Sequence, residues 1–332
     1  GRGAGLKREM KNDCLNVWKG IGAFFIVFIH CSFPSPVGGM MNGLARFAVP
    51  LFFMVSGYFS FERGMDTVRR RLGHTFRLFL TANGVYFLWD LLVMYIERRL
   101  TFEAVGELFS LDSLADWVLW NQSPFMYHLW FLGALLYCYL FYGLLVRLKK
   151  EEKVYWLIPV CLGANLILGE GAGIAGGHVA VAYIRNFWLT GLPFFLLGHW
   201  SAREQKREKL HLSSRICMGA AAFGACLSMG EMLLSGGAEL YAGSILMTCG
   251  IFLTAVQNPS AGRGSLLAHI GEKDSQSIYL WQIIIYDATS MLAKGLGIRG
   301  MSVYQWLMPL WVCLASWMLA EILEILERRR RI

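Results

Sequence analysis

The chain has few charged residues and lacks the short motifs that mark common soluble enzymes. Of its 332 residues, 16% are charged and 56% are hydrophobic, whereas soluble domains carry about 25% charged residues. It contains no Gly-rich phosphate loop, GxSxG elbow, HExxH zinc motif or nucleic-acid-binding motif. The composition therefore excludes a large soluble core, gives no reason to expect a nucleic-acid partner, and predicts a polytopic membrane protein.

The cysteines also lack a pattern. All eight lie in or beside apolar segments, with no CxxC and no paired spacing. They are expected to be small buried hydrophobic residues, and neither a disulfide nor a metal site is predicted. The first apolar segment lacks a small-residue cleavage site, because Ser32-Phe-Pro-Ser-Pro36 follows it. It is therefore expected to be a retained helix and not a signal peptide.

Ten apolar stretches are long enough to span a bilayer and predict an all-α polytopic protein with about ten transmembrane helices. They lie near 15–32, 44–61, 76–97, 128–147, 154–170, 180–200, 215–234, 239–257, 276–293 and 302–324. With the N-terminus in the cytoplasm, 25 of the 31 Lys and Arg fall on the inner side. This fits the positive-inside rule with both termini cytoplasmic, and it accounts for most of the net charge of +8. We expect a cytoplasmic segment 1–14, a membrane domain 15–325 and a basic cytoplasmic tail 326–332.

Lys19 and His30 share the first predicted helix. Eleven helical steps bring His30 to within about 20° of the face of Lys19, with a rise of about 16 Å, half a bilayer. Ionisable side chains among lipid-facing Phe, Ile and Val are costly and usually mark a functional site. A neutral imidazole suits the removal of a proton from a hydroxyl, although a histidine hydrogen-bonded between helices is the alternative. Arg46 opens the second helix at a similar depth and favours a site.

The second predicted span carries Pro50 and Gly57. Pro50 is expected to break a helical hydrogen bond, and Gly57 is expected to permit close helix packing. Taken alone, this stretch favours a purely structural role.

A basic cluster enters the third predicted helix from the cytoplasm. It comprises Arg69, Arg70, Arg71, His74 and Arg77. Clustered guanidiniums suit phosphate groups, whereas plain positive-inside topology is the alternative and is favoured for Arg69 and Arg70. At the opposite face, His128 and Trp130 open the fourth helix, where their residue types favour anchoring at the membrane interface.

Five motifs in register resemble those of the acyltransferase-3 family of bacterial membrane O-acyltransferases, over roughly 13–325. They are Lys19 with His30, Arg46 to Tyr58, His128-Leu-Trp-Phe-Leu132, Gly191-Leu-Pro-Phe-Phe-Leu-Leu-Gly198 and Ser277-Ile-Tyr-Leu-Trp281. The sequence also departs from the family pattern. Asn16 and Lys19 replace its Asp and Arg, and Gln282 stands where His is often found. The cytoplasmic Arg-x-x-Arg is matched at best by His74-Thr-Phe-Arg77 or Arg71-Leu-Gly-His74.

The resemblance implies transfer of an acyl group, usually acetyl, from cytoplasmic acyl-coenzyme A to a hydroxyl of a surface glycan or lipid-linked sugar. It places the protein in the bacterial cytoplasmic membrane, in contact with lipid. It implies His30 as general base or acyl-accepting residue, and Arg46 as a group that stabilises the oxyanion or orients the acceptor. The donor-binding residues would be Asn16, Lys19, Arg71, His74 and Arg77. His128 and Trp130 would lie on the acceptor side.

Two other functions stay open. The resemblance extends to membrane domains linked to serine racemases, which favours a proton-coupled transporter of amino acids or small metabolites. Intramembrane His, Asp and Glu residues fit such a carrier, although no inverted repeat is visible in the sequence. The second alternative is a non-catalytic sensor or scaffold, which the lack of an appended soluble domain disfavours.

Overall fold

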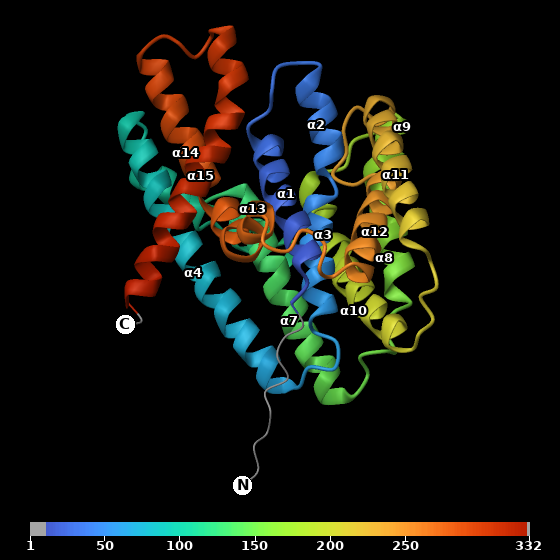
Figure 1. Cartoon of the computed structure of the whole chain (residues 1–332). Helices are drawn as coiled ribbons and strands as arrows, with labels where there is room; N and C mark the ends of the chain where they lie inside the picture. The colour runs from blue at the N-terminus through green and yellow to red at the C-terminus, as the bar shows by residue number, and fades with distance from the viewer. Residues whose placement is uncertain (1–10, 331–332) are drawn as a thin grey trace.

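The computed structural model describes residues 11–330, which form helices and no strand. Of the predicted cytoplasmic segment 1–14, residues 1–10 lie outside the described part, as do residues 331–332 of the predicted tail. Figure 1 shows a bundle of long helices in which α4, at its start, and α7, at its end, reach the same lower end of the molecule.

Long α-helices alternate with short helices and single helical turns along the described residues. In chain order the elements are α1 (Asp13–His30), α2 (Val37–Ala45), α3 (Ala48–Tyr58), α4 (Met65–Ile96), α5 (Phe102–Leu108), α6 (Leu111–Trp120), η1 (Tyr127–Leu129), α7 (Trp130–Leu148), α8 (Leu157–Leu166), η2 (Ile167–Gly171), α9 (Ala172–Ile174), η3 (Val181–Tyr183), η4 (Phe187–Gly191), α10 (Leu192–Lys206), α11 (Ser214–Ser235), α12 (Ala242–Gln257), α13 (Leu266–His269), η5 (Ile270–Asp274), α14 (Ser275–Gly295) and α15 (Ser302–Arg330).

Each of the ten predicted spans coincides with helix. Within the described residues, seven segments are long and apolar enough to cross a membrane. These are Asp13–His30, Val37–Tyr58, Met65–Ile96, Tyr127–Leu148, Leu157–Ile174, Ser214–Ser235 and Ser302–Arg329. The other three predicted spans correspond to α10, to α14 and to α12, a shorter apolar helix. The all-α, multi-pass prediction is confirmed.

Pro50 divides the second predicted span into two helices. The break between α2 and α3 falls at Arg46 and Phe47. Because proline has no N–H to offer the Arg46 carbonyl, the helical pattern of α3 starts again at Leu51, whose N–H donates to Phe47 O at 3.0 Å. The predicted break is confirmed, and it leaves Arg46 at the junction of the two helices.

Two glycines bring α3 and α10 into backbone contact. A Cβ on Gly57 would lie 1.8 Å from Phe195 O, and a Cβ on Gly198 would lie 1.9 Å from Met54 O. No larger residue fits at either position without moving a helix, so the predicted packing role of Gly57 is confirmed.

A short helical insertion, α13 with η5, packs against α1. A Cβ on Gly20 would lie 2.5 Å from Leu267 O, and a Cβ on Gly271 would lie 1.7 Å from Asn16 O. In Figure 1 the insertion lies at mid-height in the bundle, between α4 and α3 in the view. The contact holds η5, and with it the start of α14, beside the first half of α1.

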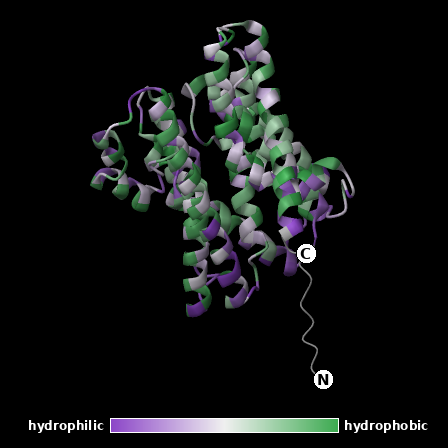
Figure 2. Cartoon of the chain, turned by 90° about the vertical axis from the view of Figure 1, so that its left-hand side faces the viewer, coloured by the Kyte–Doolittle hydropathy of each residue, from purple (hydrophilic) through white to green (hydrophobic). Residues whose placement is uncertain are grey.

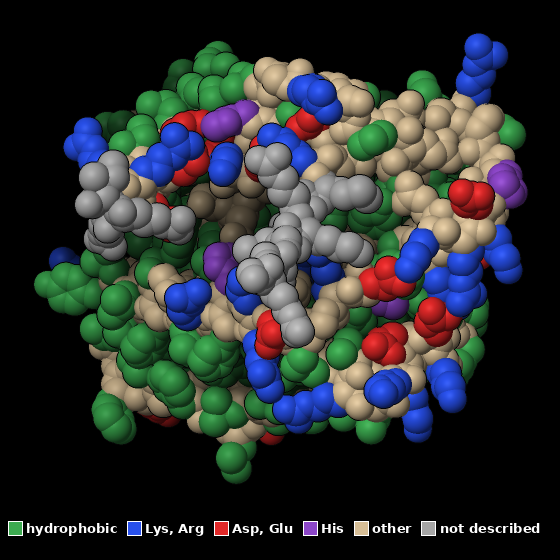
Figure 3. All heavy atoms as spheres, turned by 60° about the horizontal axis from the view of Figure 1, so that its bottom comes forward, with side chains coloured by type: hydrophobic (Ala, Val, Ile, Leu, Met, Phe, Trp, Pro, Cys, Tyr) green, Lys and Arg blue, Asp and Glu red, His purple; other side chains and the backbone are tan. Residues whose placement is uncertain are grey.

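The surface divides into an apolar belt and a basic end. Large apolar side chains such as Leu88, Leu233 and Met318 are exposed along the long helices, and Figure 2 shows hydrophilic residues gathered towards the lower end. Seen from that end, Lys and Arg side chains surround a hollow (Figure 3). An exposed apolar belt is what a helix bundle in a bilayer requires.

Candidate functional site

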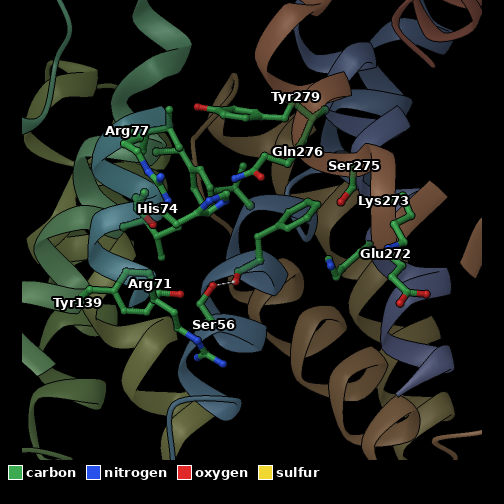
Figure 4. Close-up of a pocket in the computed structure, with 18 of the residues that line it drawn as sticks. Ser56, Arg71, His74, Arg77, Tyr139, Glu272, Lys273, Ser275, Gln276 and Tyr279 are labelled. Carbon is green, nitrogen blue, oxygen red and sulfur yellow. Dashed lines mark hydrogen bonds between the residues drawn. The ribbon is translucent and has the colours of Figure 1, made fainter. Parts of the chain in front are cut away.

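A cavity of about 790 Å³, which we call the inner cavity, lies between the first half of α4, the start of α1 and the η5–α14 segment. Its charged and imidazole-bearing lining residues are Lys19, Arg70, Arg71, His74, Arg77, Glu272 and Lys273. Figure 4 shows Arg71, His74 and Arg77 on one side of this space and Glu272, Lys273 and Gln276 across from them. The structure therefore brings together four of the five residues that the family resemblance assigned to the donor.

The fifth of those residues, Asn16, lines neither this cavity nor the smaller cavity around His30. Its carbonyl oxygen faces Gly271 at the tight contact between α1 and η5. Arg70, by contrast, lines the inner cavity, although the sequence favoured a purely topological role for it. At the edge of the site, a hydrogen bond from Lys11 to Glu272 raises the pKa of the lysine. The Lys11 Nζ atom lies 2.7 Å from Glu272 Oε2.

The cavity around His30, which we call the outer cavity, has a volume of about 50 Å³. His30 Nδ1 lies 3.1 Å from Tyr127 Oη, and the ring centroids of His30 and His128 are 6.1 Å apart. His128 is only 1% exposed, and its Nε2 lies 3.3 Å from Leu280 O. Trp130 also lines this cavity, so both residues at the start of the fourth span face the space around His30.

Two arginines share one carboxylate in the outer cavity. Arg46 Nη1 lies 3.0 Å from Glu239 Oε2, and Arg185 Nη1 lies 3.8 Å from the same oxygen. The Arg185 guanidinium carbon is 6.0 Å from the ring centroid of Tyr127. Arg185 Nε is buried and has no hydrogen-bond partner among residues 11–330. Arg46 is further held by Asn42, which accepts from its Nε at 3.1 Å. Two guanidiniums against one carboxylate leave an excess positive charge beside His30, which suits a developing oxyanion.

Four residues line both cavities and form the wall between them, which we call the septum. They are Ile26, Val49, Phe131 and Tyr279. Ile26 lies between Lys19 and His30 on the same stripe of α1, seven residues after the first and four before the second. The predicted shared face therefore places Lys19 in the inner cavity and His30 in the outer cavity, with the septum between them.

A third space of about 260 Å³, the outer mouth, adjoins the outer cavity. The two share Arg46 and Glu239. Much of the remaining lining is glycine, at Gly169, Gly173, Gly177, Gly236 and Gly237. Because glycine has no side chain, backbone forms much of the wall of the outer mouth. The Arg46–Glu239 ion pair stands where the outer mouth meets the outer cavity.

Sequence reasoning missed Arg185, Glu239, Tyr127 and Tyr279 as members of the site. A signal existed for two of them. Arg185 lies inside the apolar stretch 180–200, and Glu239 is the first residue of the stretch 239–257. Lone charges in such positions are expensive unless they meet a partner, so each could have been assigned to an interior ion pair.

Comparisons with known proteins identify the family of the chain. A family model described as an acyltransferase domain matches residues 12–320. Over 215 residues the chain is 30% identical to a serine/alanine racemase from Enterococcus gallinarum, a match that covers 60% of this chain and 30% of that protein. The chain thus matches less than a third of the length of that relative. No solved structure matches the chain.

Proposed function

Because the chain belongs to the acyltransferase family, we propose that it moves an acyl group, most simply acetyl, from cytoplasmic acyl-coenzyme A to a hydroxyl of an extracytoplasmic glycan or lipid-linked sugar. The observation that carries this proposal is the pair of cavities on either side of the septum. One cavity is wide and basic, and the other is small and holds His30.

The proposal includes an orientation in the bacterial cytoplasmic membrane. All ten predicted segments cross the bilayer, and both termini face the cytoplasm. The basic end in Figure 3 supports this arrangement, because Lys and Arg concentrate on cytoplasmic faces. The inner cavity then opens towards the cytoplasm, where acyl-coenzyme A is present.

In this proposal the inner cavity binds the nucleotide end of the donor. Arg70, Arg71, His74 and Arg77 offer guanidinium and imidazole donors to its phosphates. Lys19 adds a point charge further along the same cavity. The rise of about 16 Å from Lys19 to His30 is comparable to an extended pantetheine arm, so the thioester passes between the septum side chains to His30 while the phosphates remain at the basic end.

His30 then acts as the general base. With Nδ1–H donating to Tyr127 Oη at 3.1 Å, Nε2 is free to accept the proton of the acceptor hydroxyl. The hydroxyl oxygen attacks the thioester carbonyl, the C–S bond breaks, and the coenzyme A thiolate takes up the proton from His30. Arg46 and Arg185 stabilise the negative charge on the carbonyl oxygen. An acyl-histidine intermediate uses the same residues in two steps.

The acceptor enters from the opposite side, through the outer mouth. Its glycine-rich lining admits a bulky polar group close to the backbone, and Glu239 and Arg46 offer an acceptor and a donor of hydrogen bonds to hydroxyls. His128 and Trp130 then contact the acceptor in the outer cavity.

Equilibrium binding of labelled acetyl-coenzyme A to the purified protein tests the proposal without knowledge of the acceptor. Saturable binding that free coenzyme A displaces is expected, and Arg77→Gln or Lys19→Gln should weaken it about tenfold. Arg69→Gln is the matched control, because Arg69 belongs to the same basic run but does not line the inner cavity. Absence of binding at millimolar donor by folded protein would overturn the proposal.

The similarity to a serine/alanine racemase favours one alternative, a proton-coupled transporter of amino acids or small metabolites. Uptake of labelled serine into proteoliposomes distinguishes the two functions. Uptake without donor binding would indicate that the inner and outer cavities serve transport. Donor binding without uptake supports the acyltransferase.

A further inference from the structure

A histidine and three carboxylates meet at a place that neither cavity includes. His269 ends α13, Asp274 ends η5, and Glu321 and Glu324 lie on α15. His269 Nε2 lies 2.9 Å from Glu321 Oε1 and 3.9 Å from Asp274 Oδ2. One candidate ligand atom from each of His269, Asp274 and Glu324 lies within 4.8 Å of the other two. These four residues are called the His269 cluster below.

Asp274 is the residue that needs an explanation. Its side chain is 0% exposed, and neither carboxylate oxygen has a hydrogen-bond partner within the described residues. A buried carboxylate without a donor is strongly destabilising unless a proton or a cation compensates it. Both of its oxygens are buried, and one of them lies within 4.8 Å of a ligand atom of His269 and of Glu324. Glu324 also pairs with Arg328 at 2.7 Å, and the Arg328 side chain is 65% exposed.

The local backbone aligns the ligands. In an α-helix, residues five apart diverge by about 140°, so His269 and Asp274 would face different directions. The η5 segment is instead a π-helix, with hydrogen bonds between residues five apart, a feature frequent at functional sites. This turn brings the imidazole and the buried carboxylate together on the side that faces α15.

We propose that His269, Asp274 and Glu324 bind a divalent transition-metal ion, with Glu321 as a further ligand or as the partner that orients His269. One imidazole with carboxylates is a donor set that Zn²⁺ and Mn²⁺ accept. The His269 side chain is 41% exposed and gives the ion a route from water. No metal site was predicted from the sequence. His269 and Asp274 lie at the two ends of a π-helical turn, and Glu324 lies on a helix about fifty residues later, so the ligands form no local motif.

The ion would fix one wall of the inner cavity. Asp274 lies between Lys273 and Ser275, and both neighbours line that cavity. A metal bound by residues of both η5 and α15 would connect this wall to α15. None of the described α15 residues lines the inner cavity. The metal site stands on its own geometry and does not depend on the acyltransferase proposal.

Metal content and affinity test the inference. The full chain is purified in detergent without a metal-chelating resin, its metals are counted by elemental analysis, and Zn²⁺ and Mn²⁺ are titrated calorimetrically after chelation. About one ion per chain is expected, together with a higher unfolding temperature in its presence. Asp274→Asn and Glu324→Gln should each weaken binding at least 10–100-fold, the range seen when even outer-shell partners are removed.

Asp287→Asn is the matched control, since it removes a carboxylate on α14 away from the cluster, where Trp89 Nε1 donates to it at 3.4 Å. It should bind the metal as the wild type does. Wild-type protein that binds neither Zn²⁺ nor Mn²⁺ at about 100 µM would overturn the inference, and so would Asp274→Asn with unchanged affinity. If the wild type binds no metal and Asp274→Asn is more stable than the wild type, the inference is overturned. A proton shared within the cluster then compensates the buried carboxylate. Metal binding by the wild type is measured without any variant, so the inference remains testable even if a variant fails to fold.

Discussion

The inner and outer cavities hold their charges in opposite ways. The inner cavity is large, and its residues Arg70, His74 and Arg77 are exposed on the first turns of α4. The outer cavity is small, and its guanidiniums are fixed against Glu239 and Asn42. Exposed charges on long side chains suit capture of a large soluble anion, whereas fixed charges in an enclosed space suit stabilisation of a charge that appears during reaction. Under the proposed function, the two cavities therefore divide binding from chemistry.

Removal of His30 should give the largest effect and test that division directly. His30→Ala is expected to lower acetyl transfer by about 10²–10⁴-fold, because the hydroxyl loses its base. The dissociation constant of acetyl-coenzyme A should stay unchanged, because the septum separates His30 from the inner cavity. His211→Ala, at an exposed loop position, is the control. Transfer by His30→Ala at the wild-type rate would refute the mechanism.

The next effect concerns stability. Glu239→Gln leaves Arg46 and Arg185 without their counter-charge, and the carboxylate is only 22% exposed. A loss of roughly 2–3 kcal/mol in unfolding free energy is expected, somewhat below that for a fully buried pair. Glu152 makes a close comparison, because it also accepts from two arginines but is 45% exposed. Glu152→Gln should cost under about 1 kcal/mol. Equal losses, measured by unfolding in detergent, would contradict the contrast between enclosed and exposed charges.

Salt should separate the cavities further. An increase from about 0.05 to 0.5 M ionic strength shortens the screening length well below 10 Å. Donor affinity should fall about tenfold, because it depends on exposed cations. The rate of transfer at saturating donor should change by less than about twofold, since the charges around His30 are enclosed. If the transfer rate falls as steeply as the donor affinity, the charges that determine the rate are exposed to solvent, and the contrast between the cavities is wrong.

The smallest effect concerns the septum. Phe131→Ala removes part of the wall between the cavities and should allow longer acyl chains to reach His30. The preference for acetyl- over butyryl-coenzyme A, measured as a ratio of transfer rates, is expected to fall about tenfold. Phe141→Ala, on the same helix but outside both cavities, should leave the ratio unchanged. An unaltered ratio in Phe131→Ala would show that acyl length is selected elsewhere.

Much of the fold and part of the site follow from local patterns in the sequence. Apolar stretches predicted the long helices, and helical periodicity predicted the common face of Lys19 and His30. Pro50 predicted the break that leaves Arg46 at a helix junction. These features depend on residues a few turns apart, whose relation is fixed by helix geometry.

Other parts of the site depend on contacts that no local pattern contains. Arg46 and Glu239 are 193 residues apart in the chain, and only tertiary packing brings their side chains together. Asn16 shows the converse. It lies three residues before Lys19 on α1, yet it does not line the inner cavity, and its carbonyl oxygen lies against Gly271. Its assignment to the donor rests on the family resemblance alone.

The septum also matters for the cell. Water-accessible spaces that joined across a bilayer would let protons and ions run down their gradients, and the energy stored across the membrane would be lost. Three of the four septum residues are purely apolar, and the hydroxyl of the fourth, Tyr279, donates to the His128 carbonyl. In the proposed orientation, this mostly apolar wall opposes a continuous file of water. In that orientation, the protein opens one space towards each compartment and still leaves the membrane electrically sealed.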